Sequence, residues 1–325
     1  MTAEKSTEIK SKIIDLLKRK DDFLLLGHHS ADGDSLGSII ALSHFLKKQL
    51  GKRVYMPYPE KFPIRYSFLE NSRTLFEPYT KGRDYTTIVL DCSSSNRLHA
   101  DEAIDKVNID IVIDHHEGTP DFRGIQWSRP DYPAVGIMIY EILKDMDADF
   151  TPEISEALYT AILTDTGQFA FAGTTSESLK IAGFLIDHGA QPAKIARHLY
   201  WEFPHEYILN MKAALNRLEL LFDKKVSFVY LLKKDMQTEK QINETEAIID
   251  LGIMIKGVEI TALFREIDEN MTRISFRSRD GINVSKLAKK FGGGGRFNAS
   301  GCNIHENIEK SKKMIIDEIS EMAEI

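Results

Sequence analysis

Three short apolar runs in the first third of the chain each lead into residues that can bind a metal ion or move a proton. The runs and the residues that follow them are 23–26 with His28, 87–90 with Asp91, and 109–113 with Asp114, His115 and His116. Short apolar runs of this kind are typical of buried strands in a parallel sheet. Open α/β sheets bind their ligands beyond the carboxyl ends of such strands. The sequence therefore predicts an α/β fold with a polar site at one edge of its sheet.

Residues 1–190 alternate between predicted strands and predicted helices. The strands are expected at 23–27, 54–56, 87–91 and 109–114, and the helices at 7–20, 36–50, 134–146, 152–165 and 176–188. We expect Asp34 to cap the second helix and Gly51 to end it, and Thr151 before Pro152 marks the start of another. This alternation predicts a mostly parallel, doubly wound sheet covered on both faces.

The rest of the chain follows a different pattern. Residues 191–224 are predicted to form a helical linker. Residues 225–325 are predicted to form a smaller α+β domain, with strands at 226–231, 258–264, 272–277 and 299–302 and helices at 244–254 and 284–291. Four consecutive glycines, 292–295, break the last of these helices, because glycine is a poor helix former.

Composition restricts the class of protein. No apolar run approaches the roughly 20 residues that span a bilayer, and the polar N-terminus lacks the apolar segment of a signal peptide. The two cysteines, Cys92 and Cys302, lie far apart and are expected to be reduced thiols of a cytoplasmic protein. A net charge of −7 argues against a broad non-specific hold on nucleic acid. It allows a local basic pocket, and arginines concentrate in the last third of the chain at Arg265, Arg273, Arg277, Arg279 and Arg296.

Six residues from different segments form a candidate metal-binding set. They are His28, Asp32, Asp34, Asp91, His115 and Asp165. Carboxylate oxygens with some imidazole nitrogen suit Mn²⁺, Mg²⁺ or Co²⁺ better than a structural zinc site. Four carboxylates around one point repel one another unless cations compensate them, and two divalent ions would neutralise all four. Sites with two ions ~3.5–4 Å apart serve in-line displacement at phosphoesters.

An alternative interpretation treats these residues as ordinary helix caps and surface carboxylates. For Asp34 alone a capping role is as good an explanation as a ligand role, and the two are compatible. Cys92, next to Asp91, is predicted to be a small buried thiol rather than a soft metal ligand.

The motifs around these residues resemble those of the DHH phosphoesterases. The matching segments are residues 27–38, Asp91 with Arg97, Asp114-His115-His116 and Thr164-Asp165-Thr166-Gly167. Residues 291–295 and Ala299-Ser300-Gly301 resemble the glycine-rich motif of the C-terminal domain that accompanies this family. The resemblance covers nearly the whole chain. It is strongest to the stand-alone members that hydrolyse short oligoribonucleotides and dephosphorylate pAp.

The resemblance implies roles for the individual residues. His28, Asp32 and Asp91 would hold one manganese ion, and Asp34, Asp91, His115 and Asp165 would hold a second, with Asp91 as the bridge. His116 would contact the scissile phosphate or assist proton transfer, and Asp114 would orient its neighbours. A water activated by the metals would be the nucleophile.

The family also implies a substrate-binding region in the second domain. Arg277 and Ser278 would hold the substrate phosphate that is not cleaved, Arg265 is a weaker candidate, and the backbone of Gly293, Gly294 and Gly295 would cradle an anion. Arg296 stands where the family has histidine. Arginine can bind a phosphate but cannot exchange a proton near neutral pH. Ala31 replaces a proline usual in the first motif, which should matter little.

The expected activity is manganese-dependent hydrolysis of short RNA and of nucleotide bisphosphates. A cyclic di-AMP or pApA phosphodiesterase is the main alternative, because such relatives share every motif. A processive single-strand exonuclease, a manganese pyrophosphatase and a catalytically inactive nucleotide-binding regulator fit less well. We expect no membrane partner. The family is often dimeric, which makes a homodimer possible.

Overall fold

The computed structural model describes residues 2–28, 31–57, 62–98, 108–116, 118, 120–236, 246–279, 281–295 and 297–322. The chain divides into two compact units, Met1–Leu199 and Tyr200–Ile325. A π-helical turn, Arg197–Trp201, spans the division between them. No helix in the described ranges is both long and apolar enough to cross a membrane.

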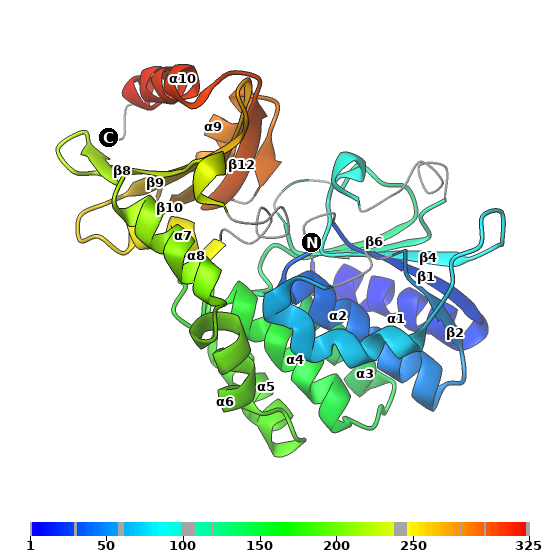
Figure 1. Ribbon diagram of the computed structural model, residues 1–325. Coiled ribbons are helices and arrows are strands. Elements are labelled where there is room, and N and C mark those ends of the chain that lie inside the picture. Colours follow the sequence, from blue (N-terminus) through cyan, green and yellow to red (C-terminus); the bar gives the residue numbers. More distant parts are fainter. Residues whose placement is uncertain are drawn as a thin grey trace. The chain divides into compact units, whose positions relative to one another are not determined.

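The first unit contains a six-stranded sheet and its helices (Figure 1). Its strands are β1 (Asp22–Leu26), β2 (Arg53–Tyr55), β3 (Phe76–Glu77), β4 (Thr86–Leu90), β5 (Ile111–Asp114) and β6 (Ile125–Ser128). Its helices are α1 (Ala3–Arg19), α2 (Gly33–His44), α3 (Val135–Asp145), α4 (Pro152–Asp165), α5 (Ser176–Asp187) and α6 (Pro192–Ala196). The sequence did not predict the short strands β3 and β6, because neither combines length with continuous apolar character.

All neighbouring strands of this sheet run parallel, in the order β3-β2-β1-β4-β5-β6. The chain first builds outward from β1 to β3 and then returns to the other side of β1 with β4. This is the doubly wound order, in which the direction of winding reverses between β1 and β4. The predicted fold class is confirmed, and the reversal point marks the edge at which such sheets bind ligands.

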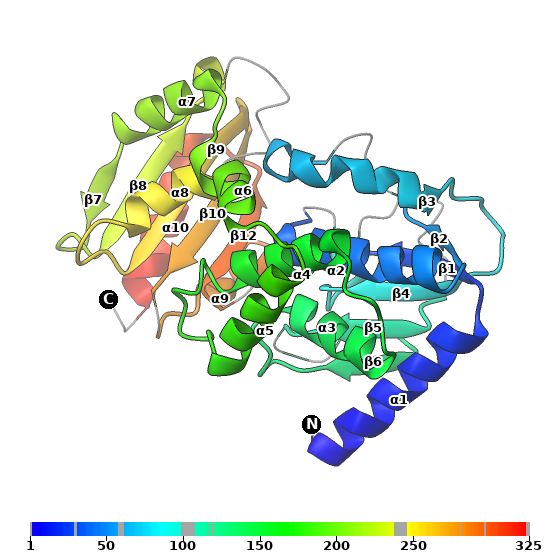
Figure 2. The same ribbon diagram turned by 90° about the horizontal axis from the view of Figure 1, so that it is seen from below.

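The two faces of the sheet are covered differently. Helices α1, α2, α3 and α4 lie on one face (Figures 1 and 2). The other face carries a cluster of buried strand residues such as Leu24, Val89 and Val112, packed with Phe122 and other side chains from connecting segments. Consecutive strand residues point to opposite faces, so both faces of these short apolar runs are buried.

One capping prediction was wrong. Asp34 does not cap α2; the N-cap is Asp32, whose carboxylate accepts hydrogen bonds from the backbone N–H groups of Asp34 and Ser35. The predicted start of α4 is confirmed, since Thr151 caps the helix and Pro152 is its first residue. Both arrangements satisfy backbone donors that a helix leaves without partners in its first turn.

The second unit is built on a mixed six-stranded sheet in the order β11-β12-β10-β9-β8-β7. Its strands are β7 (Glu219–Leu221), β8 (Val226–Leu231), β9 (Ile260–Asp268), β10 (Met271–Ser278), β11 (Gly294–Gly295) and β12 (Ala299–Ile304). Its helices are α7 (His205–Leu215), α8 (Glu246–Ile253), α9 (Val284–Lys290) and α10 (Ile308–Glu321). Strands β8 and β9 are parallel and the other pairs antiparallel, which confirms the predicted α+β character.

Separate apolar clusters cover the two faces of this sheet. On one face, Phe228, Phe264 and Phe276 pack with α9 and α10 in the larger core. On the other face, Val229, Leu231 and Leu263 pack against buried residues of α7 and α8. This second cluster draws on β8 and β9, and β10 contributes no member to it.

Candidate metal centre

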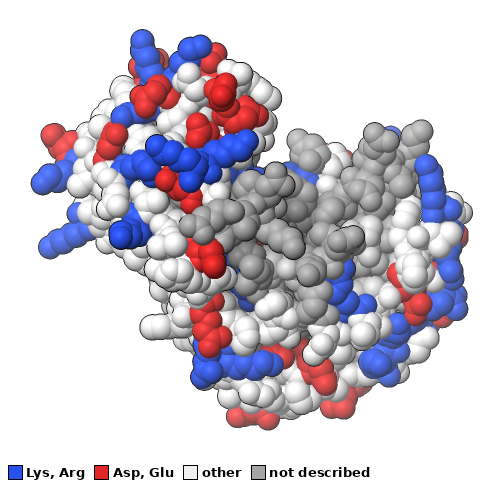
Figure 3. Space-filling model, in the orientation of Figure 1, with Lys and Arg blue, Asp and Glu red and all other residues white. Residues whose placement is uncertain are grey.

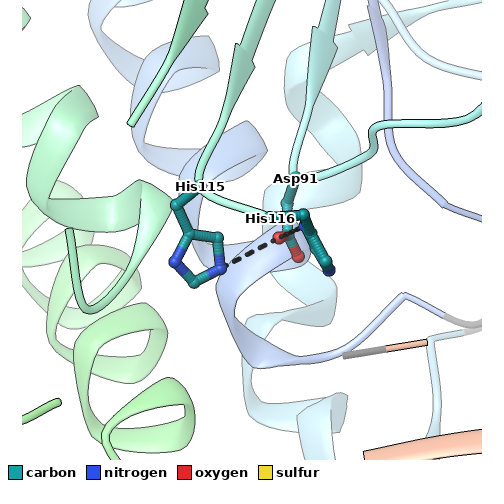
Figure 4. Close-up of side chains that lie close together, drawn as sticks. All are labelled: Asp91, His115 and His116. Atoms are coloured by element: carbon teal, nitrogen blue, oxygen red, sulfur yellow. Dashed lines mark ion pairs between the residues drawn. The ribbon is translucent and has the colours of Figure 1, made fainter. Parts of the chain in front are cut away.

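The polar residues after β1, β4 and β5 meet at the reversal point of the first sheet. Because β1 pairs with β4 and β4 with β5, their carboxyl ends lie side by side. His28 follows β1, Asp91 follows β4, and His115 and His116 follow β5. Figure 4 shows the two imidazoles on either side of the Asp91 carboxylate. These four side chains are buried or nearly so.

Asp91 lies between the other members of the cluster. Its Oδ2 is 3.5 Å from His28 Nε2, and its Oδ1 is 3.6 Å from His115 Nε2 and 3.5 Å from His116 Nδ1. Its backbone has φ 58°, in the left-handed region that few residues other than glycine adopt. Such conformations persist only where the surroundings enforce them, and they concentrate at functional sites. The backbone N–H of Asp91 donates to Ile113 O at 3.0 Å, which holds this turn against β5.

Two glycines bring Asp165 to the same place by allowing α2 and α4 to pack closely. A Cβ atom at Gly37 would lie 2.3 Å from the carbonyl oxygen of Ala157, and one at Gly33 would lie 2.5 Å from the Thr164 side chain. Helix α4 ends at Asp165, whose Oδ2 is 3.0 Å from His115 Nε2. Gly33 is the first residue of α2, and the close contact with α4 explains why glycine is required there.

Asp34 is fixed by the start of another helix. Its Oδ2 accepts from the N–H of Val135 at 2.7 Å and its Oδ1 from the N–H of Gly136 at 2.8 Å, so Asp34 caps α3. Its Oδ2 also lies 3.8 Å from His115 Nε2. Complete burial, followed by the nearby charge of Asp91, raises the pKa of Asp34 to about 7. Burial and the neighbouring carboxylates of Asp91 and Asp32 therefore favour a proton on Asp34.

The histidines present nitrogen atoms to these carboxylates. His115 Nδ1 is 2.9 Å from the carbonyl oxygen of Tyr132. A carbonyl only accepts, so the neutral imidazole carries its proton on Nδ1 and directs the lone pair of Nε2 into the cluster. That Nε2 is buried and has no hydrogen-bond partner among the described residues. The sequence could not reveal the role of Tyr132, because the contact uses its backbone.

His28 is held differently, by the carboxylates that face it. Its Nε2 lies 3.8 Å from Asp32 Oδ1 and 3.5 Å from Asp91 Oδ2. Burial opposes protonation of this imidazole, but Asp32 and Asp91 together outweigh burial and raise its pKa to about 9. A proton on His28 therefore partly replaces the positive charge that a metal ion would bring.

Asp114 and His116 form a buried pair beside this cluster. Asp114 Oδ1 accepts a hydrogen bond from His116 Nδ1 at 2.7 Å. Burial alone would raise the pKa of Asp114, but its interaction with His116 outweighs burial and holds the pKa below its usual value. An ionised Asp114 fixes the tautomer and the orientation of the His116 ring.

The donor set fits divalent metal ions. Among the described residues, three groups have ligand atoms within 4.8 Å of one another: His28 with Asp32 and Asp91, Asp34 with His115 and Asp165, and Asp91 with His115 and His116. Asp91 and His115 each belong to two groups, so the groups form one continuous cluster. Cys92 is buried, donates to Ser94 O, and burial raises its pKa to about 11, which disfavours the thiolate that a soft ligand requires.

The predicted substrate-binding residues lie in the second unit, and the structure separates them. Arg277 is half-buried on β10, with its Nε 3.9 Å from Asp250 Oδ1. The next residue, Ser278, points to the opposite face, and its Oγ donates to Ile282 O at 2.6 Å. Arg265 is buried on β9. Arg296 lies outside the described residues.

The glycine run forms β11 and the turn before it. A Cβ atom at Gly293 would lie 2.1 Å from the carbonyl oxygen of Gly301, and Gly295 has φ 146°. Glycine at these two positions is therefore required by the pairing of β11 with β12 as well as compatible with the predicted anion cradle.

Charges of both signs are mixed on one face of the protein. Figure 3 shows lysines and arginines interspersed with acidic residues on the face drawn. The expectation that long nucleic acids are not held by a broad basic surface stays a prediction from the net charge of −7.

Comparison with known proteins identifies both units. Residues 22–162 match the N-terminal domain of the DHH family, and residues 223–323 match the DHHA1 domain. A relative from Thermus thermophilus named bifunctional oligoribonuclease and PAP phosphatase NrnA is 28% identical, over 90% of this chain and 88% of its own length. A Bacillus subtilis protein of the same name is 26% identical over 91% of this chain and 94% of its own length.

The fold is also that of a solved structure. The crystal structure of an exopolyphosphatase-related protein from Bacteroides fragilis matches with a TM-score of 0.83 and 25% identity, covering 96% of this chain and 95% of that one. The matches to the two domains follow each other in the order seen in the structure and together cover most of the chain. The chain therefore contains a DHH domain followed by a DHHA1 domain.

Proposed function

We propose that this protein is a metal-dependent phosphoesterase that hydrolyses short oligoribonucleotides to mononucleotides and dephosphorylates pAp. The relatives from Thermus thermophilus and Bacillus subtilis, which match about nine-tenths of the chain, are named as oligoribonucleases and PAP phosphatases. The ions would be two Mn²⁺, with Mg²⁺ or Co²⁺ as substitutes, because oxygen donors predominate in the cluster.

The observation that carries the proposal is the position of Asp91. One of its carboxylate oxygens faces His28 and the other faces His115, so a single residue can serve two ions. In this proposal His28, Asp32 and Asp91 hold the first ion, and Asp34, Asp91, His115 and Asp165 hold the second. Two bound ions would polarise the phosphoryl group and acidify an attacking water.

Asp114 would orient His116, and His116 would exchange a proton with the substrate. Asp114 holds the Nδ1 of His116, and His116 would exchange a proton with the reacting phosphate or leaving group through its Nε2. Asp34 is held at both oxygens by the backbone of α3, and its position is therefore independent of substrate. This preorganisation is what transfer of a highly charged group requires.

In the second unit, Arg277 and the backbone of Gly293–Gly295 would bind a substrate phosphate that is not cleaved, and Arg296, which follows the glycines in the sequence, is a further candidate. The hydroxyl of Ser278 is already donated to Ile282 O, so its contribution would come through the backbone. Binding of a terminal phosphate by these residues would favour short oligonucleotides over long polymers.

A competition assay tests the proposal. Purified protein with Mn²⁺ is mixed with equal amounts of pAp, a short RNA, pApA, cyclic di-AMP, pyrophosphate and polyphosphate, and the products are separated by anion exchange. Faster loss of pAp and short RNA supports the proposal. Faster loss of cyclic di-AMP or pApA would show that the protein is instead a phosphodiesterase for a cyclic dinucleotide or its linear product. Preference for pyrophosphate or polyphosphate, or no loss of any substrate, would contradict the proposal.

A further inference from the structure

Two arginines face each other across the central strands of the second sheet. Arg265 on β9 is directly paired with Arg273 on β10, and residues paired in this way have their side chains on the same face. Leu231 on β8 is the other neighbour of Arg265. Because Leu231 belongs to the cluster beneath α7 and α8, both arginines lie on that face of the sheet. Arg265 is only 4% exposed.

The charge of this pair is not balanced within the described structure. No described oxygen accepts a hydrogen bond from Arg265 or Arg273, and Arg265 Nε is fully enclosed without a partner. Burial, followed by repulsion from Arg273, lowers the pKa of Arg265 to about 10. Burying a guanidinium without an acceptor is costly, and placing a second cation opposite adds to that cost.

Other arginines of the same unit have acceptors. Arg217 forms an ion pair with Asp235 at 2.7 Å, and Arg279 donates to the carbonyl oxygens of Val258 and Ile253. Lack of an acceptor is therefore not shared by these two other arginines of the second unit. A pair of forked donors that lacks an acceptor is the arrangement that binds a phosphate.

We propose that Arg265 and Arg273 form an anion-binding site for a phosphate group, separate from the site at Arg277. Arg273 and Arg277 share a face of β10 and are four residues apart, which corresponds to about 13 Å along a strand. One phosphate cannot contact both positions, whereas a chain of several nucleotides can. The ligand is thus an internal phosphate of an oligonucleotide whose terminal phosphate lies at Arg277, and this identification rests on the proposed function.

Binding measured without turnover tests the site. The full-length protein in EDTA is titrated with a 5′-phosphorylated RNA tetranucleotide and, separately, with AMP, which carries one phosphate. Arg265→Leu and Arg273→Ala are each expected to weaken tetranucleotide binding by about tenfold, as for loss of a charged hydrogen bond. AMP binding should stay unchanged, and Arg279→Ala should alter neither affinity. Unchanged tetranucleotide binding in both variants, or equal loss for AMP, would overturn the proposal.

The stability of the ligand-free variant gives a second and independent result. Arg265→Leu is expected to raise the Tm, because it replaces an uncompensated buried charge with an apolar side chain. Saturating tetranucleotide should then stabilise wild type more than Arg265→Leu. A lower Tm in Arg265→Leu would show that the arginine has a partner within the protein and would overturn the proposal. Since no step requires hydrolysis, failure of this site and failure of the proposed activity are distinguishable.

Discussion

Two regions of the molecule differ in how their charged side chains are compensated. These regions are the candidate metal centre of the first unit and the arginine-bearing sheet of the second unit. At the centre, buried carboxylates lie against imidazoles and helix N–H groups, and protons fill part of the role of a cation. On the sheet, Arg265 and Arg273 have no acceptor among the described residues. The candidate metal centre is therefore suited to binding cations, and the Arg265–Arg273 pair is suited to binding an anion.

The largest expected effect concerns Asp91. Asp91→Asn should reduce kcat for short RNA by about 10³-fold, as when one essential electrostatic contact is removed. Asparagine tolerates the left-handed conformation of this residue, so the fold should be retained. The measurement is single-turnover hydrolysis with Mn²⁺, with circular dichroism as the folding control. Retained activity would show that Asp91 does not bridge two metal ions that are needed for catalysis.

Asp114→Asn should lower kcat by about 10²-fold, the usual contribution of an acid or base held in position. The amide cannot stabilise a charged His116 as the carboxylate does. The matched control is Asp110→Asn at the residue before β5, where the carboxylate accepts a hydrogen bond from the N–H of Thr87. Equal rates in the two variants would show that Asp114 has no catalytic positioning role. Metal content should be unchanged in both.

The packing of α2 on α4 can be tested by a pair of substitutions. Gly37→Ala should lower the free energy of unfolding by about 2–3 kcal/mol, since the new Cβ collides with the Ala157 carbonyl. Gly183→Ala on α5 meets open space and should raise it by about 0.5–1 kcal/mol. Urea denaturation measures both. Destabilisation of similar size in the two variants would mean that close approach is not what requires glycine at position 37.

The pH dependence of metal binding follows from the pKa shifts. In the metal-free protein the stabilising proton on His28 is fully present below pH 6.5 and is lost as pH rises through about 9. Asp34 also favours its protonated form in the fold, so metal-free stability falls as pH rises from 3.8 to about 7. Metal binding must release these protons, so affinity should rise about tenfold per pH unit for each proton released.

The corresponding measurement is the increase in Tm caused by Mn²⁺ between pH 6 and 8.5 under nitrogen, with EDTA as the metal-free reference. The increase should grow with pH. An increase that is constant over this range would show that no proton is exchanged for the metal.

The smallest expected effect concerns the substrate side. Arg296→His should raise turnover on short RNA by about two- to fivefold, because histidine can exchange a proton near pH 7. Steady-state kinetics would separate kcat from KM. An unchanged or lower kcat would show that Arg296 is adapted to the substrate of this protein.

The sequence was sufficient to predict the sheet edge because its signal is local. Apolar runs ending in His28, Asp91 and His115 indicate buried parallel strands, and the carboxyl ends of such strands converge. The glycine-rich motif also indicated that a second domain follows the first in the sequence. The sequence could not predict contacts between these side chains and backbone atoms from distant segments. Examples are the Tyr132 carbonyl oxygen at His115 and the N–H groups of α3 at Asp34.

Register explains the remaining differences. That Arg265 lies opposite Arg273 depends on how β9 pairs with β10, and a shift of one residue would place either side chain on the other face. Likewise, Arg277 and Ser278 are neighbours in sequence but point to opposite faces, so their side chains cannot bind the same phosphate.

The central claim is that Asp91 is shared by two metal ions. Crystals grown with Mn²⁺ and measured at the manganese absorption edge would test it most directly. We predict two anomalous peaks about 3.5–4 Å apart, with an oxygen of Asp91 at each, and no more than one peak in Asp91→Asn crystals. A single peak in the wild type, or two peaks that do not share Asp91, would contradict it.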